Sequence, residues 1–164
     1  MGGLKMAKMI SISIPGWGNM EIENIVLDLN GTIATDGKIP SEVKEKINSL
    51  SDKAKICILT ADTQGTATEE ISDMRVELLR VSEEDSTEVK IRVVESLDPT
   101  KTVAIGNGNN DRLILKEAAL GIAVLGEEGM SVLAMKDADI VVRDISNALD
   151  LFLKPKRLIA TLRE

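Results

Sequence analysis

Histidine and tyrosine are absent from this 164-residue chain, which carries a single cysteine, a single tryptophan and a single phenylalanine. Without histidine the chain cannot build imidazole metal sites, histidine general bases or Ser-His-Asp triads. Cys57 has no second cysteine with which to form an intramolecular disulfide, and its apolar sequence neighbours predict an unreactive core thiol in a reducing compartment. Because aromatic residues make up only 1% of the chain, the core must be built from aliphatic side chains and methionine.

Basic residues are outnumbered by acidic ones, 20 against 27, which gives a formal net charge of -7. Proteins that bind nucleic acids hold the phosphate backbone with clustered Lys and Arg, so we expect no nucleic-acid partner. No apolar run reaches membrane-spanning length and no signal peptide is visible, so we expect no membrane partner and a cytoplasmic location. The length and the 43% share of hydrophobic residues predict a single domain over residues 1–164.

Short apolar segments alternate with amphipathic ones along the chain, which predicts an α/β fold with a doubly wound, mainly parallel sheet. Strict alternation of apolar and polar residues over 9–14 predicts a β-hairpin extension over residues 1–24. We expect the catalytic core over residues 25–145, including a helix over residues 65–74. C-terminal helices are expected over residues 146–164.

The stretch I-V-L-D-L-N-G-T-I, residues 25–33, is the most informative in the chain. Its first four residues form an apolar run that ends in Asp28, as expected for a strand buried on both faces of a parallel sheet. Asp28 then lies at the carboxyl end of that strand, where open α/β sheets place their ligands. Gly31 permits a sharp turn close to a bound anion, and Thr32 adds a hydroxyl group.

Polar groups follow two further predicted strands, at Thr60 and in the loop over residues 107–111. The carboxyl ends of parallel strands share one edge, so these groups can converge with Asp28, and Lys90 can reach the same crevice from the start of a helix. Carboxylates, a hydroxyl and an ammonium suit a phosphate together with Mg²⁺. In this setting Asp28 is either a metal ligand or a nucleophile that forms an aspartyl phosphate.

Four segments in this order, D-L-N-G-T, T-A-D, K-I-R-V-V-E-S-L and G-N-G-N-N-D, resemble the motifs of the haloacid dehalogenase superfamily. The chain is most similar to the phosphorylation domain of P-type ATPases, which carries D-K-T-G-T, T-G-D, K-x-x-x-V-x-x-L and G-D-G-x-N-D. The resemblance covers roughly residues 22–145. Because no membrane span is visible, the chain looks like a soluble relative of these pumps, with a Rossmann-like fold.

The resemblance implies a Mg²⁺-dependent phosphohydrolase that acts on a phosphorylated small molecule or an acyl phosphate. Asp28 resembles the nucleophile, and Thr60 with Lys90 resembles the phosphoryl-binding pair. The metal ligands implied by the resemblance are Asp28, the Asn30 backbone carbonyl, Asn107 and Asp111. The candidate substrate contacts are Gly31, Thr32, Ala61 and Asn110.

Two departures from the family pattern argue for slow turnover. Phosphatases of the family carry Asp as general acid and base where this chain has Asn30, whose amide cannot shuttle a proton. The first Asp of the G-D loop is replaced by Asn107, which removes a negative charge from the metal site. An alternative interpretation is therefore a catalytically weakened module that binds a phosphorylated ligand or a partner protein.

Other interpretations of the same residues stay open. Gly106-x-Gly108 can begin a dinucleotide-binding loop, although the third glycine of that motif is absent. Lys101 is a rival to Lys90 as the phosphate-binding lysine, and Asp62 can cap the helix after Thr60. The intervals from Asp28 to Thr60 and from Thr60 to Lys90 leave room for one helix each, which predicts a capless fold. An open crevice favours a large substrate or a neighbouring subunit as lid, so we expect a homo-oligomer.

Overall fold

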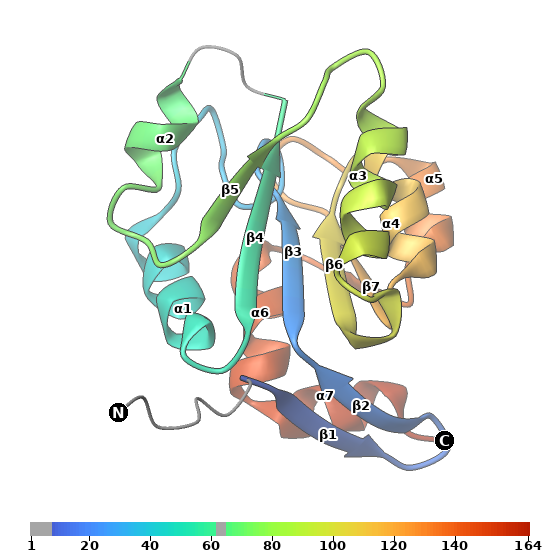
Figure 1. The fold of residues 1–164 in the computed structure, drawn as a ribbon. Coiled ribbons are helices and arrows are strands. Elements are labelled where there is room, and N and C mark those ends of the chain that lie inside the picture. Colours follow the sequence, from blue (N-terminus) through green and yellow to red (C-terminus); the bar gives the residue numbers. More distant parts are fainter. Residues whose placement is uncertain (1–7, 62–64) are drawn as a thin grey trace, which may run out of the picture.

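A computed structural model describes residues 8–61 and 65–164. Its centre is a six-stranded sheet in which every strand pair is parallel, in the order β5-β4-β3-β6-β7-β8 (Figure 1). The strands are β3 (Asn24–Asp28), β4 (Lys55–Thr60), β5 (Glu77–Arg80), β6 (Thr102–Gly106), β7 (Leu120–Val124) and β8 (Ile140–Val142).

The central strand β3 is buried along its whole length, which explains its unbroken apolar sequence. Ile25 and Leu27 belong to the hydrophobic cluster on one face of the sheet, while Val26 belongs to the cluster on the other face. The period-2 alternation of a strand therefore supplies both cores from one apolar run. This arrangement leaves Asp28 as the first polar side chain at the carboxyl end of the strand.

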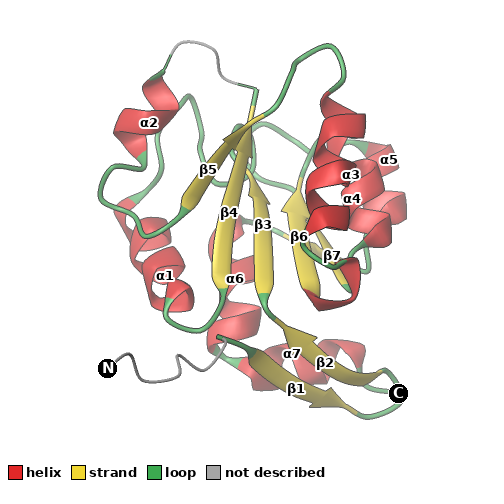
Figure 2. Cartoon of the chain, viewed as in Figure 1, coloured by secondary structure: helices red, strands yellow, loops and turns green. Residues whose placement is uncertain are grey.

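Helices cover both faces of the sheet (Figure 2). One face packs against α1 (Ser41–Ser51) and α6 (Ile145–Leu153), and the other packs against α3 (Ser86–Ser96), α4 (Arg112–Glu117) and α5 (Val132–Asp137). The remaining helices are α2 (Thr66–Glu70) and α7 (Pro155–Leu162), and the 3-10 turns are Pro99–Lys101 and Asn109–Asp111. None of the helices within the described ranges combines the length and apolar character needed to cross a bilayer.

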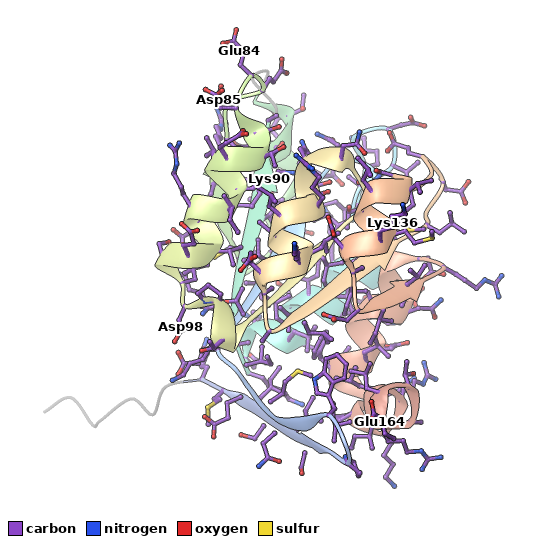
Figure 3. All side chains as sticks on the ribbon, turned by 90° about the vertical axis from the view of Figure 1, so that its right-hand side faces the viewer. Glu84, Asp85, Lys90, Asp98, Lys136 and Glu164 are labelled. Carbon is purple, nitrogen blue, oxygen red and sulfur yellow. The ribbon has the colours of Figure 1, made fainter. Side chains whose placement is uncertain are left out.

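An antiparallel hairpin of β1 (Ile10–Ile14) and β2 (Gly18–Ile22) forms a separate two-stranded sheet. Its buried face packs with α7 at the end of the molecule where β3 begins (Figure 1). The backbone N–H of Glu164 donates to the Pro15 carbonyl at 3.0 Å. Figure 3 shows Glu164 beside the hairpin, at the opposite end of the molecule from Glu84 and Asp85. The hairpin therefore lies away from the carboxyl edge of the sheet.

The predicted α/β fold, with its parallel sheet and N-terminal hairpin, is confirmed. The helix expected over residues 65–74 is shorter than predicted, because α2 spans only Thr66–Glu70. After it, the N–H groups of Ser72 and Met74 donate to carbonyls three residues back, so the chain continues in turns instead of α-helix. The division at residues 24 and 145 stays a prediction, and residues 1–7 and Asp62 lie outside the described part.

Candidate active site

The carboxyl ends of three adjacent strands bring the candidate residues together. Asp28 ends β3, Thr60 ends β4, and β6 ends at Gly106 immediately before the loop that contains Asp111. Strand β3 pairs with both β4 and β6, so the three ends are neighbours in the sheet. Asp28, Thr60 and Asp111 are all buried, which is costly for carboxylates unless they have partners.

Lys90 is the shared partner of the two carboxylates. Its Nζ lies 2.8 Å from Asp28 Oδ1 and 2.7 Å from Asp111 Oδ1, and 3.3 Å from the side-chain oxygen of Asn110. Lys90 belongs to α3, beside α4 in Figure 3, and its side chain is only 2% exposed. Burial lowers the pKa of the ammonium, but attraction by the two carboxylates outweighs burial and raises it. Lys90 is therefore held charged between Asp28 and Asp111.

Asp28 occupies the centre of this cluster. Its Oδ2 accepts a hydrogen bond from the Thr32 hydroxyl at 3.2 Å, and its Oδ1 contacts Lys90. Burial and repulsion by Asp111 together raise the pKa of Asp28 from 3.8 to about 6, against the lowering effect of Lys90. The carboxylate is still mostly ionised at pH 7, so it can act as a nucleophile or a metal ligand.

Asp111 is fixed by the backbone of its own loop. Its Oδ2 accepts from the N–H groups of Asn107 and Gly108, both at 3.0 Å. A Cβ atom added at Gly106 would lie 2.5 Å from the Asp111 carboxyl carbon, so the side chain occupies the space that glycine leaves open. These contacts give both glycines a role in seating Asp111, and they do not support the dinucleotide-loop alternative.

Asn107, in the loop after β6, connects the loop after β3 to the loop after β7, a role that sequence reasoning missed. Its Oδ1 lies 3.1 Å from the Thr32 hydroxyl, which shares its single proton between Asn107 Oδ1 and Asp28 Oδ2, and its Nδ2 donates to the Gly129 carbonyl at 3.2 Å. A Cβ atom at Gly31, whose φ is 80°, would lie 2.5 Å from Asn107 Nδ2. Glycine at position 31 is therefore required both by the left-handed backbone and by the close approach of Asn107.

The other candidates are less tightly engaged. Asn30 is exposed, and within residues 8–61 and 65–164 its side chain and carbonyl form no hydrogen bond or ion pair. The hydrogen bonds of the β-bridge between Asn30 and Ala34 join Ala34 to Gly31 and Leu29. Ala61 is half-buried at the end of β4. Lys101, the rival lysine, pairs with Glu23 at 3.3 Å. It immediately precedes β6, at the opposite end of the parallel strands from Asp28. The structure thus brings Lys90, and not Lys101, to the cluster.

The donor set fits a hard divalent cation. Asp28 and Asp111 present carboxylate oxygens, the kind of ligand that Mg²⁺ prefers, and the Asn30 carbonyl accepts no hydrogen bond from any described residue. Among the described residues, however, no three acidic, histidine or cysteine side chains gather to hold a metal. Asp28, Asp111 and Lys90 together carry one net negative charge, because the ammonium offsets one carboxylate. The residues present therefore fit Mg²⁺ with most of its ligands supplied by water or substrate.

Sequence comparisons find relatives in Methanocaldococcus jannaschii, although no protein-family model matches. Uncharacterized protein MJ0073 is 51% identical over 79 residues, 46% of this chain and 85% of that protein. Uncharacterized protein MJ0072 is 64% identical over 39 residues, 24% of this chain and 89% of that protein. A soluble P-type ATPase-like phosphatase is 28% identical over 140 residues, which are 83% of this chain but only 51% of the phosphatase, so the chain spans about half its length.

Solved structures with the same fold include a phosphatase and a putative hydrolase. The 3-deoxy-D-manno-octulosonate 8-phosphate phosphatase from Moraxella catarrhalis, solved with magnesium, phosphate and KDO, has a TM-score of 0.69 at 14% identity and covers 87% of this chain and 94% of its own. A putative HAD superfamily (subfamily III A) hydrolase from Legionella pneumophila also has a TM-score of 0.69, at 12% identity over 85% and 86% of the two chains. The chain therefore has the haloacid dehalogenase fold and belongs to the same family as MJ0073 and MJ0072.

Proposed function

We propose that the protein is a Mg²⁺-dependent phosphohydrolase that forms an aspartyl phosphate on Asp28. The observation that carries this proposal is the buried Asp28 carboxylate, held at a strand end between the Lys90 ammonium and the Thr32 hydroxyl. A buried carboxylate with a raised pKa and a specific charged partner is a candidate for a functional site. The likeness to a soluble P-type ATPase-like phosphatase supports the same assignment.

In the first step, one Asp28 oxygen attacks the phosphorus of the substrate, and the bond from phosphorus to the leaving oxygen breaks. The leaving oxygen keeps the electron pair of that bond and takes its proton from water. Lys90 faces the non-bridging oxygens of the transferring group and stabilises their negative charge. Asp28, the Asn30 carbonyl and Asp111 would hold Mg²⁺, which would supply further positive charge to the same group.

In the second step, water attacks the phosphorus, the bond to Asp28 breaks, and inorganic phosphate leaves with the free carboxylate restored. This water must lose a proton, and general acid or base help is worth ~10²–10⁴-fold in such steps. Asn30 lies where such a group would act in the resembled family, and its amide is neither acid nor base. We therefore expect substrates with good leaving groups, acyl or aryl phosphates, and slow hydrolysis of the phosphorylated enzyme.

The test is a phosphatase panel of acyl, aryl and alkyl phosphates with Mg²⁺, run beside the Asp28→Asn variant. We expect Mg²⁺-dependent release of phosphate from the acyl and aryl members by the wild type, and none by Asp28→Asn. Activity that survives in Asp28→Asn would exclude Asp28 as the nucleophile. Apart from β4, the described residues between β3 and β5 form only the helices α1 and α2, so we also expect a second copy of the chain to cover the crevice, which light scattering can check.

A catalytically weakened binding module is the second candidate. It is favoured by Asn30, whose exposed amide is neither acid nor base, and by the single net negative charge of the cluster Asp28, Lys90 and Asp111. In this case the protein binds phosphorylated ligands without turning them over. Calorimetric binding of a phosphate ester by the wild type, with no product formed, would select this candidate.

A further inference from the structure

A pocket of about 470 Å³ opens beside residues 31–33 of the loop after β3. Gly31 and Thr32 form part of its wall, and the Thr32 hydroxyl contacts Asp28 Oδ2 at 3.2 Å. The volume lies in the range of small-molecule sites. A leaving group attached to a phosphoryl group at Asp28 can therefore extend into this pocket.

The walls of the pocket are braced against one another. The N–H of Gly126 donates to the Arg143 carbonyl at 3.1 Å, which ties together the loops that follow β7 and β8. A Cβ atom at Gly126, whose φ is 42°, would lie 3.2 Å from the Gly31 carbonyl oxygen. The loop after β7 thus packs closely on the loop after β3. The two walls of the pocket are therefore held in place by contacts with each other.

Two of the charged residues in the lining already have partners. Glu42 pairs with Lys46 at 3.1 Å, and Asp144 caps α6 by accepting from the N–H of Asn147 at 2.9 Å. The other two charged residues, Glu127 and Arg143, have no hydrogen bond or ion pair through their side chains with any described residue. The pocket therefore offers one uncommitted carboxylate and one uncommitted guanidinium on adjoining loops.

We infer that this pocket receives a leaving group that carries both an ammonium and a carboxylate, as an amino-acid head does. The ammonium would pair with Glu127 and the carboxylate with Arg143. A leaving group with a carboxylate alone would face an excess of acidic residues in the lining, and one with an ammonium alone would leave Arg143 unpaired. The exposed apolar surface of Leu125 and Pro40 suits the hydrocarbon or aryl part between head and phosphate.

This inference rests on the proposed phosphohydrolase function, so its test uses substrates that share one leaving atom. O-phosphotyrosine, tyramine phosphate, 3-(4-phosphonooxyphenyl)propanoate and phenyl phosphate are all aryl phosphates. The first carries both charged groups, the second only the ammonium, the third only the carboxylate, and the fourth neither. We would measure kcat/KM for each with Mg²⁺, and calorimetric binding of each to Asp28→Asn. The variants are Glu127→Gln and Arg143→Gln, with the exposed Glu128→Gln and Arg92→Gln as controls.

We expect each head-group contact to raise kcat/KM by about fivefold, as for a partly exposed ion pair. O-phosphotyrosine should be preferred over phenyl phosphate, Glu127→Gln should reduce the preference due to the ammonium, and Arg143→Gln should reduce that due to the carboxylate. Equal values for all four compounds, or equal losses in the control variants, would overturn the inference. Absence of turnover with all four compounds would contradict the proposed function instead, and the binding series would still decide whether the pocket selects the double-charged head.

Discussion

The side-chain amide of Asn107 joins the Thr32 hydroxyl to the Gly129 carbonyl, at 3.1 Å and 3.2 Å respectively. The amide is suited to this position because it accepts with one atom and donates with the other. A carboxylate at position 107 would add a negative charge near Asp28, but it would place an oxygen against the Gly129 carbonyl. The neutral side chain at position 107 thus makes a contact with the loop after β7 that a carboxylate could not make.

Asn107→Asp is expected to change metal binding and stability in opposite directions. The added charge should lower the Mg²⁺ concentration needed for half-maximal binding or activity, while loss of the bond to Gly129 should lower the free energy of unfolding by about 1 kcal/mol. A Mg²⁺ titration and urea unfolding measure the two effects. Asn107→Ala is the control, because it removes both contacts without adding charge. An unchanged titration would place Asn107 outside the influence of the metal.

Lys90→Met should be strongly destabilising, because it leaves the buried carboxylates of Asp28 and Asp111 without their cation. Removal of one partner from a buried ion pair costs ~3–5 kcal/mol, whereas an exposed pair is worth ~0–1 kcal/mol. Lys101→Met, which breaks the half-exposed pair with Glu23, should therefore have a much smaller effect. Urea unfolding of the two variants is the measurement. Similar losses of unfolding free energy in both variants would mean that Lys90 does not stabilise the buried carboxylates.

The pH dependence of stability should change in Asp28→Asn. The folded protein holds the Asp28 proton more tightly than the unfolded chain does, since its pKa is raised from 3.8 to about 6. Stability conferred through this group is therefore lost as the pH rises from about 4 to about 6, and is then constant. Without Mg²⁺, Asp28→Asn should not show this loss of stability. Its free energy of unfolding at pH 7 should exceed that of the wild type by ~1–3 kcal/mol.

Melting temperatures at pH 4.5 and pH 7 test this expectation, with the exposed Glu84→Gln as the control for charge removal. Glu84→Gln should follow the wild type at both pH values. If Asp28→Asn is less stable than the wild type at pH 7, the carboxylate is held favourably in the fold, and the raised pKa is wrong.

The sequence predicted the sheet and the position of Asp28 because both depend on local pattern. An apolar run buried on both faces is expected to end in a carboxylate where the strand leaves the sheet, at its carboxyl end. The parallel strands bring Thr60 and Asp111 to the same end of the sheet. The choice of Lys90 over Lys101 needed the structure. Both lysines flank predicted strands or helices, and only the packing of α3 shows which ammonium reaches Asp28.

Features that depend on contacts between loops could not be predicted. The link from Asn107 to Gly129 requires the conformation of the loop after β7, in which Gly126 and Gly129 both have positive φ. That Glu127 and Arg143 line the same pocket likewise depends on how two loops meet. The length of α2 was overestimated because its polar sequence continues past Glu70 with no strong stop signal, while the backbone changes to turns.

Asn30→Asp tests the central claim, that Asp28 is phosphorylated and that Asn30 limits hydrolysis of the aspartyl phosphate. Steady-state rates on an aryl and an alkyl phosphate would be combined with intact mass after an acid quench, for the wild type, Asn30→Asp and Asp28→Asn. We expect the wild type to accumulate a phosphorylated form, Asn30→Asp to turn over faster by about 10²-fold with less of that form, and Asp28→Asn to form none. Rapid hydrolysis of the alkyl phosphate by the wild type, with no gain in Asn30→Asp, would contradict the account.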